Sequence, residues 1–84
     1  MASAKVSLLY FAQARDAAGT EREDFVVRNP VTAGSLVLQA AKSHPGLLKL
    51  RHVIRVAVNQ QVVAGKVVLR DGDEVALLPP IMGG

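Results

Sequence analysis

Few side chains in this sequence could carry out catalysis by themselves. Histidine occurs only as His44 and His52, and the chain contains no cysteine. A nucleophilic triad needs a serine, threonine or cysteine beside a general base. His44 stands directly before a Pro-Gly pair, so we interpret it as a residue at the end of a helix rather than as a base. We therefore predict no catalytic triad within the chain.

Metal and phosphate sites are not indicated either. The seven carboxylates fall into two groups, at 16–24 and 71–74, and no cluster of histidine and carboxylates has the spacing of metal ligands. The Asp-Gly-Asp at 71–73 is a strong turn signal. The absence of cysteine excludes a thiolate metal site and a disulfide framework, and no glycine-rich phosphate loop is present. We expect no metal and no tightly bound cofactor.

The charges are unevenly distributed. The chain has ten basic and seven acidic residues, for a formal net charge of +3, and the interval from Phe25 to Arg70 contains no acidic residue. Such a basic surface could meet nucleic acid or an acidic protein. The chain has only three aromatic residues, which is too few for a platform on which bases stack. We favour a solvated surface and no nucleic-acid partner, with a small nucleic-acid-binding domain as the alternative.

The carboxyl end is the last candidate for chemistry. The chain closes with Pro-Pro-Ile-Met-Gly-Gly at 79–84, which is too rich in proline and glycine to continue a sheet. Taken alone, a terminal Gly-Gly favours a disordered end. Its place directly after an expected strand and two prolines is unusual and keeps it a candidate.

The N-terminal half is expected to form two strands and two helices. Residues 5–11 alternate as a strand, and a lysine and a serine mark one of its faces as solvent-facing, so Phe11 falls on the exposed side or at the rim. An alanine-rich stretch at 12–18 suits a short helix capped by glycine. A strand at 23–28 follows. A helix then begins after the N-cap Thr32 and ends near Ser43.

The C-terminal half is expected to consist mainly of strands. We predict them at 53–58, 61–63 and 74–78, with a short extended piece at 66–69. In the last strand Leu78 shares the solvent-marked face, as Phe11 does in the first.

This order of elements predicts a two-layer α+β domain, with a mixed sheet of four to five strands packed on a helix. At 84 residues the chain has room for one domain, which we place at 1–78, followed by a flexible tail at 79–84. No apolar run is long enough for a membrane span or a signal peptide. We therefore expect a cytoplasmic protein without a membrane partner.

Five motifs carry a resemblance that covers essentially the whole chain. They are Phe-Ala-Gln-Ala-Arg-Asp-Ala-Ala-Gly at 11–19, His-Pro-Gly-Leu at 44–47, Val-Ala-Val-Asn-Gln at 56–60, Asp-Gly-Asp-Glu-Val-Ala at 71–76 and Leu-Pro-Pro-Ile-Met-Gly-Gly at 78–84. In these motifs the chain resembles the small, ubiquitin-like subunits of molybdopterin synthase. The turn, the prolines and the terminal glycines are typical of β-grasp sulfur carriers as a group. The motif at 11–19 is typical of the molybdopterin branch.

The resemblance implies a β-grasp (ubiquitin-like) fold and a sulfur carrier in molybdenum cofactor biosynthesis. It implies that the reactive group is the Gly84 carboxylate, which an adenylating enzyme activates with ATP and a sulfur donor protein converts to a thiocarboxylate. The loaded tail then gives its sulfur to cyclic pyranopterin monophosphate inside the large synthase subunit, with two loaded copies needed per product. The chain would thus be a non-catalytic, sulfur-donating subunit of a heterotetrameric sulfurtransferase.

The resemblance also implies which residues meet the large subunit. The apolar docking positions match Phe11, Val62 and Leu78. The tail that enters the large subunit consists of Pro79, Pro80, Ile81, Met82, Gly83 and Gly84. Two features depart from the family pattern: Met82 stands where a small residue is usual, and the chain is basic whereas members are often acidic.

Two other readings of the same tail are left open by the sequence. One is a sulfur carrier for another pathway, such as thiamine, cysteine or tRNA thiolation. The other is a protein modifier joined to target lysines through an isopeptide bond, since the same adenylated Gly84 would serve.

Overall fold

The computed structural model of the chain describes residues 3–79, and residues 80–84 of the expected tail lie outside that range. It contains a five-stranded sheet and three helices in these residues. In chain order the elements are β1 Ser3–Tyr10, α1 Ala12–Ala18, β2 Arg22–Arg28, α2 Ala33–Ser43, α3 Gly46–Leu50, β3 Arg55–Val58, β4 Gln61–Val63 and β5 Glu74–Leu78.

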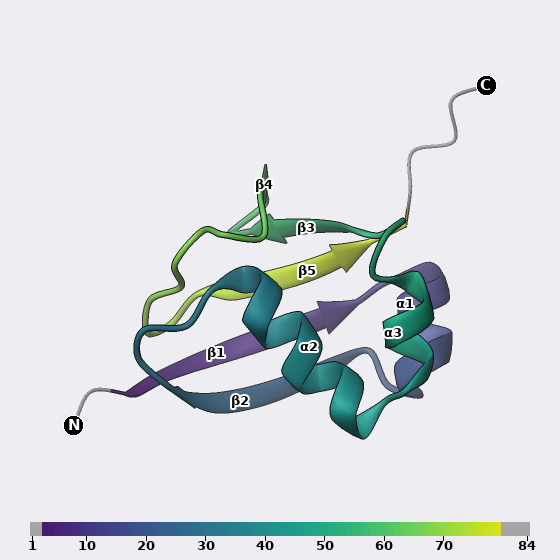
Figure 1. Cartoon of the computed structure of the whole chain (residues 1–84), viewed down its shortest axis with the longest axis horizontal. Coiled ribbons are helices and arrows are strands. Elements are labelled where there is room, and N and C mark those ends of the chain that lie inside the picture. The colour runs from purple at the N-terminus through teal and green to yellow at the C-terminus, as the bar shows by residue number, and fades with distance from the viewer. Residues whose placement is uncertain (1–2, 80–84) are drawn as a thin grey trace.

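The sheet is mixed and has the strand order β2-β1-β5-β3-β4. β1 and β5 run parallel in the middle, and the other neighbouring strands pair antiparallel. Figure 1 shows α2 crossing one face of the sheet, with α1 and α3 gathered at the end toward which β5 points. This arrangement confirms the predicted α+β class and the mixed sheet on a helix.

The core lies between α2 and the sheet, as the sequence patterns predict. In β1 every second residue is buried, ending with Leu8 and Tyr10 at 0% and 2% exposure. From α2 the buried positions fall at helical spacing and include Leu36 and Val37. Full burial of each such leucine contributes about 1.5–3 kcal/mol to folding. The apolar periodicity of strand and helix therefore determines which faces meet.

Local signals begin and end several elements where the sequence predicts. Thr32 caps α2, because its hydroxyl accepts a hydrogen bond from the Ser35 N–H at 3.1 Å. Gly19 ends α1 in the left-handed region at φ 74°, with its N–H donating to the Arg15 carbonyl at 2.8 Å. These caps fix the directions in which the chain enters α2 and leaves α1.

The structure departs from the sequence prediction around residues 46–69. A third helix, α3, begins at Gly46, where the proline and glycine predicted only the end of α2. β3 begins at Arg55 rather than at 53, because residues 51–53 form a turn after α3. In the stretch expected to be extended at 66–69, only Val68 forms a bridge, with Thr32.

Candidate functional site

The base of the C-terminal tail is positioned by the central strands of the sheet. β5 lies between β1 and β3 and ends at Leu78, and the exposed Pro79 is the last residue that the structure describes. The predicted tail residues Pro80, Ile81, Met82, Gly83 and Gly84 lie outside the described range. The chain therefore leaves the domain from the middle of the sheet rather than from an edge.

The face of the sheet opposite α2, which we call the outer face, carries a continuous apolar row. Strand register places Leu9 beside Ala76, Ala76 beside Ala57, and Ala57 beside Val62. This row crosses four strands from β1 to β4, next to the point where the tail begins. Leu78 stands one row further along β5, opposite Arg55 on β3.

Strand register places the three predicted docking residues on this outer face, with Phe11 beside Leu78 and Val62 apart from them on the edge strand β4, where it also borders the groove toward α2. Phe11 follows β1, and its backbone N–H donates to the Leu77 carbonyl at 3.2 Å, which holds it beside the end of β5. Its side chain is 44% exposed, and that of Val62 is 55% exposed. Leu78 is partly buried between the neighbouring strands. The strand parity predicted for Phe11 and Leu78 is confirmed.

Three further apolar residues belong to this face: Leu9 and Ala76, which are partly exposed, and Ala57, which is only 4% exposed and supports the row rather than offering contact surface. Leu9 and Ala76 follow from the same alternation that identified Phe11 and Leu78, so the signal was present in the sequence. Ala57 could not be found in that way, because its place between Ala76 and Val62 depends on the pairing of three strands. Ala57 and Ala76 place only methyl side chains at the centre of this row.

The half of the outer face over β2 and the beginning of β1 is mostly polar instead, with the exposed Val26 of β2 among its charged side chains. The Nη2 of Arg22 donates a hydrogen bond to the Ser7 hydroxyl at 2.8 Å. The Nε of the same arginine lies 3.3 Å from Asp24 Oδ1. The Ser7 hydroxyl in turn donates to Asp24 at 2.9 Å. The hydrogen bond from Ser7 and the nearby Arg22 lower the pKa of Asp24. The outer face is thus divided into an apolar half beside the tail base and a charged half at the β2 border.

Both histidines predicted to have no catalytic role lie away from the outer face. His44 is the C-cap of α2, as expected, and its Nε2 lies 2.7 Å from Glu23 Oε1. The Tyr10 hydroxyl donates to the same oxygen at 2.6 Å. The hydrogen bond from Tyr10 and the contact with His44 lower the pKa of Glu23, whereas burial and Glu23 raise the pKa of Tyr10. This cluster joins β1, β2 and the end of α2.

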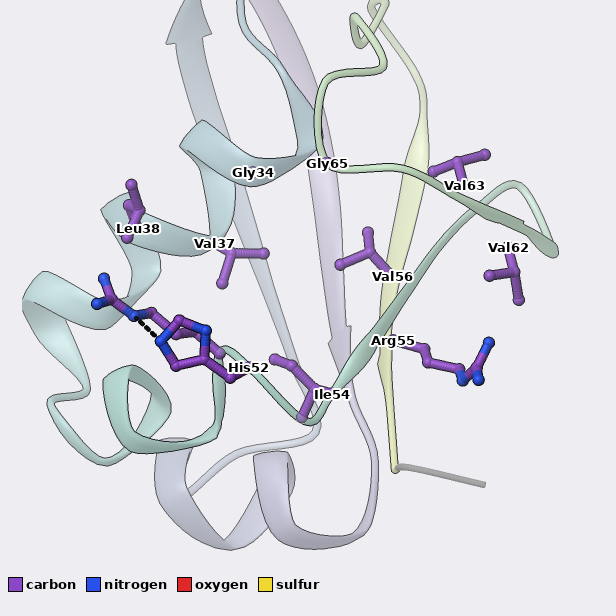
Figure 2. A pocket seen from close by; sticks show the side chains of 11 residues that line it. Gly34, Val37, Leu38, His52, Ile54, Arg55, Val56, Val62, Val63 and Gly65 are labelled. Atoms are coloured by element: carbon purple, nitrogen blue, oxygen red, sulfur yellow. Dashed lines mark hydrogen bonds between the residues drawn. The ribbon is translucent and has the colours of Figure 1, made fainter. Parts of the chain in front are cut away.

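A groove of about 500 Å³ opens between α2 and the β3–β4 edge. Figure 2 shows Val37 and Leu38 of α2 on one side of it and Val56, Val62 and Val63 on the other. The groove also contains His52, whose Nε2 accepts a hydrogen bond from Arg51 Nε at 3.2 Å. No carboxylate or nucleophilic hydroxyl lines it. Its lining therefore offers packing surface rather than a set of catalytic groups.

Residues 3–79 hold no group of three or more histidine, cysteine or carboxylate side chains that could bind a metal ion. None of the helices in the same range is long and apolar enough to cross a membrane.

Comparison with known sequences gives matches along nearly the whole chain. The model of the ThiS family matches residues 8–84. A molybdopterin synthase sulfur carrier subunit of Mycobacterium tuberculosis is 41% identical over 81 residues, covering 95% of this chain and 98% of the relative. The human molybdopterin synthase sulfur carrier subunit is 37% identical over 83 residues, with 95% and 94% covered.

Solved structures share the same architecture. Small archaeal modifier protein 1 of H. volcanii superposes with a TM-score of 0.82 at 26% identity, covering 93% of this chain and 99% of that one. A chain from the complex of subunits 1 and 2 of the Helicobacter pylori molybdopterin-converting factor has a TM-score of 0.63 at 25% identity, with 95% and 99% covered. Together with the strand order, these likenesses identify the fold as ubiquitin-like β-grasp.

Proposed function

Because the chain belongs to the ThiS family, we propose that it is the sulfur carrier subunit of a molybdopterin synthase and acts in molybdenum cofactor biosynthesis. Relatives that carry this name match 94–98% of the chain, at up to 41% identity. Its reactive group is then the Gly84 carboxylate, and its place of action is the cytoplasm.

One observation carries the proposal: the tail begins beside the exposed apolar half of the outer face. Leu78 and Phe11 flank the tail base, and the row ending at Val62 extends away from it. A partner that covers this face also receives the tail. The five residues after Pro79 can reach roughly 17 Å when extended, which is enough to place Gly84 inside that partner.

The residue types suit this chemistry. A carboxylate becomes a good electrophile only after activation, when a Gly84 oxygen attacks the α-phosphorus of ATP and pyrophosphate leaves. A persulfide on the donor protein then attacks the acyl carbon and displaces AMP, giving an acyl disulfide. A thiol cleaves the S–S bond of this disulfide, forming a new disulfide with the donor's sulfur and releasing a thiocarboxylate, which is ionised at neutral pH and is a good nucleophile. Gly83 and Gly84 have no side chains to obstruct a narrow channel. Pro79 and Pro80 restrict the base of the tail and reduce the entropy lost on insertion.

Three partners follow from the proposal. The synthase large subunit covers the outer face and receives the tail, as the assembly of the similar Helicobacter pylori chain with its second subunit suggests. An ATP-dependent adenylating enzyme and a sulfur donor protein load Gly84. We further propose that the acid and base groups for the transfer come from the large subunit.

Deletion of Gly84 tests this function. We expect it to abolish molybdopterin formation in a reaction reconstituted with the large subunit, the adenylating enzyme and the sulfur donor. Thermal unfolding should not change, because the core lies between α2 and the sheet. Full activity of the shortened chain, or its failure to fold, would contradict the role given to the tail.

A second candidate function is protein modification. The high likeness to small archaeal modifier protein 1 favours it, because that name describes a modifier. The adenylated Gly84 would then form an isopeptide bond with a target lysine. Conjugates that are present in native cells and vanish when Gly84 is deleted would support this candidate.

A further inference from the structure

The free edge of β2 is a surface that the proposed function does not use. β2 pairs only with β1 and forms one border of the sheet in the described part of the chain (Figure 1). An edge strand presents unpaired backbone N–H and C=O groups that another strand can bind. Val26, in the middle of β2, is 70% exposed, more than any other large apolar side chain among the described residues.

The hydrogen bonds to β1 show which backbone groups of β2 point outward. Tyr10 N–H donates to the Glu21 carbonyl at 2.9 Å, and the antiparallel register continues this pairing into β2. In an antiparallel pair, residues that bond the neighbour alternate with residues whose backbone groups point away from it. The outward-pointing residues are therefore Arg22, Asp24, Val26 and Arg28.

These same four residues also present their side chains on the outer face. Asp24 is opposite Ser7 and Val26 is opposite Lys5, both on the solvent-facing side of β1. All four are exposed. A strand added to this edge would thus meet a positive, a negative, an apolar and a positive side chain in turn.

We propose that the β2 edge pairs antiparallel with the same edge of a second copy of the chain, about a two-fold axis at Val26. In this register Val26 lies opposite its own counterpart. Asp24 lies opposite the second copy's Arg28, and the symmetric pair repeats on the other side of the axis. Within its own copy Asp24 uses Oδ1 for Ser7 and Arg22, so Oδ2 is the oxygen that would meet Arg28. Unlike charges directly opposite each other stabilise a strand pair, whereas like charges destabilise it.

The charges select this register from its neighbours. Moving the axis to Phe25 places Arg22 opposite Arg28 at both ends. Moving it to Val27 places Asp24 opposite Pro30, which has no N–H to donate. Only the axis at Val26 gives two pairs of opposite charge around an apolar centre.

The expected dimer is weak and leaves the tail available. Pairing over residues 24–28 spans about 17 Å, which makes an interface in the small, transient class. We expect a dissociation constant on the order of 0.1–1 mM. The apolar half of the outer face, over β5, β3 and β4, stays open in such a dimer, so the pairing is independent of sulfur transfer.

Sedimentation equilibrium of the full chain, from about 10 µM to about 1 mM, tests the pairing. Arg28→Asp places an aspartate opposite Asp24 twice per dimer and should weaken association by roughly tenfold or more. Arg51→Asp makes the same change of charge at the exposed C-cap of α3, outside the sheet, and should have no effect. The double variant Asp24→Arg with Arg28→Asp restores opposite charges and should restore the dimer. The proposal would be overturned if the chain is a monomer at every concentration, or if Arg28→Asp leaves the dissociation constant of the dimer unchanged.

Cross-linking tests the register independently of the charges. The chain contains no cysteine, so Val26→Cys introduces a single thiol at the proposed axis, where strand pairing brings the two copies within disulfide distance. With diamide as oxidant, it should form a disulfide dimer much faster than Leu48→Cys, a variant at an exposed position on α3. Equal rates would contradict the axis at Val26.

Discussion

Phe11 shows how one residue can serve binding rather than stability. Its neighbour Tyr10 is buried at 2% exposure, but Phe11 is 44% exposed beside the end of β5. An aromatic side chain in that position adds little to the core and offers a large apolar contact to a partner. The sequence alternation alone was enough to distinguish the two aromatic residues.

We predict that Phe11→Glu weakens binding of the synthase large subunit by at least about tenfold, because a charge replaces a central apolar contact. The free energy of unfolding should fall by less than about 1 kcal/mol, as for other half-exposed positions. Isothermal titration calorimetry and chemical denaturation measure the two effects.

Leu48→Glu is the matched control for this prediction. The exposed fraction of Leu48, 46%, is similar to the 44% of Phe11. Leu48 lies on α3, however, and not on the outer face. It should leave the affinity unchanged within about twofold. A Phe11→Glu variant that unfolds easily yet binds normally would place Phe11 in the core and refute its role.

At the scale of elements, strong local patterns were predictable and tertiary packing was not. β1, α1, α2 and β5 follow from alternation, helical spacing and caps. α3 has only five residues, and its N-cap Pro45 and first residue Gly46 are residue types that usually end helices. It forms because Leu47 is fully buried and because Gly46 approaches Ala17 so closely that a Cβ there would lie 3.1 Å from the Ala17 Cβ.

The residues of the candidate site were likewise predictable where they depend on one strand and not where they depend on pairing between strands. Phe11 and Leu78 could be placed on the outer face from parity within their own strands. Val62 came only from the resemblance, since the register of the short β4 is set by its pairing with β3. Ala57 was missed for the same reason, and Gly84 depends on the resemblance alone. Contacts between strands are the part that a single sequence does not contain.

The cluster of Tyr10, Glu23 and His44 links three elements and makes stability depend on pH. The pKa of Glu23 is lower in the folded chain than its ordinary value of 4.5. Its ionised form therefore stabilises the fold fully above that value. This contribution is lost as the pH falls from about 4.5 through the lower folded-state pKa.

We predict that Glu23→Gln lowers the free energy of unfolding by about 1 kcal/mol at pH 7, because the hydrogen bonds from Tyr10 and His44 lose a charged acceptor. The difference from the native chain should shrink as the pH falls below about 4. Urea denaturation across pH 3–7 measures this difference in the free energy of unfolding. Glu21→Gln removes the same charge at an exposed position and should show little effect, and an equal effect of both variants would contradict the cluster.

At the scale of the whole molecule, stability and recognition occupy different surfaces. The core and the cluster around Glu23 lie on the helix side of the sheet, whereas the tail base and the apolar row lie on the outer face. The β2 edge is a third surface with its own charge pattern. This separation is why variants of Gly84, Phe11 and Val26 should each alter one property and leave the fold intact.

The central claim, that the chain carries sulfur on its terminal carboxylate, is tested most directly by the intact mass of the protein from its native cells, purified without reducing or alkaline treatment. We predict a fraction heavier by the exchange of one oxygen for one sulfur, with fragmentation mapping the exchange to Gly84. Free protein without any oxygen-for-sulfur exchange, found together with heavier isopeptide conjugates, would contradict the role of sulfur carrier and favour that of protein modifier.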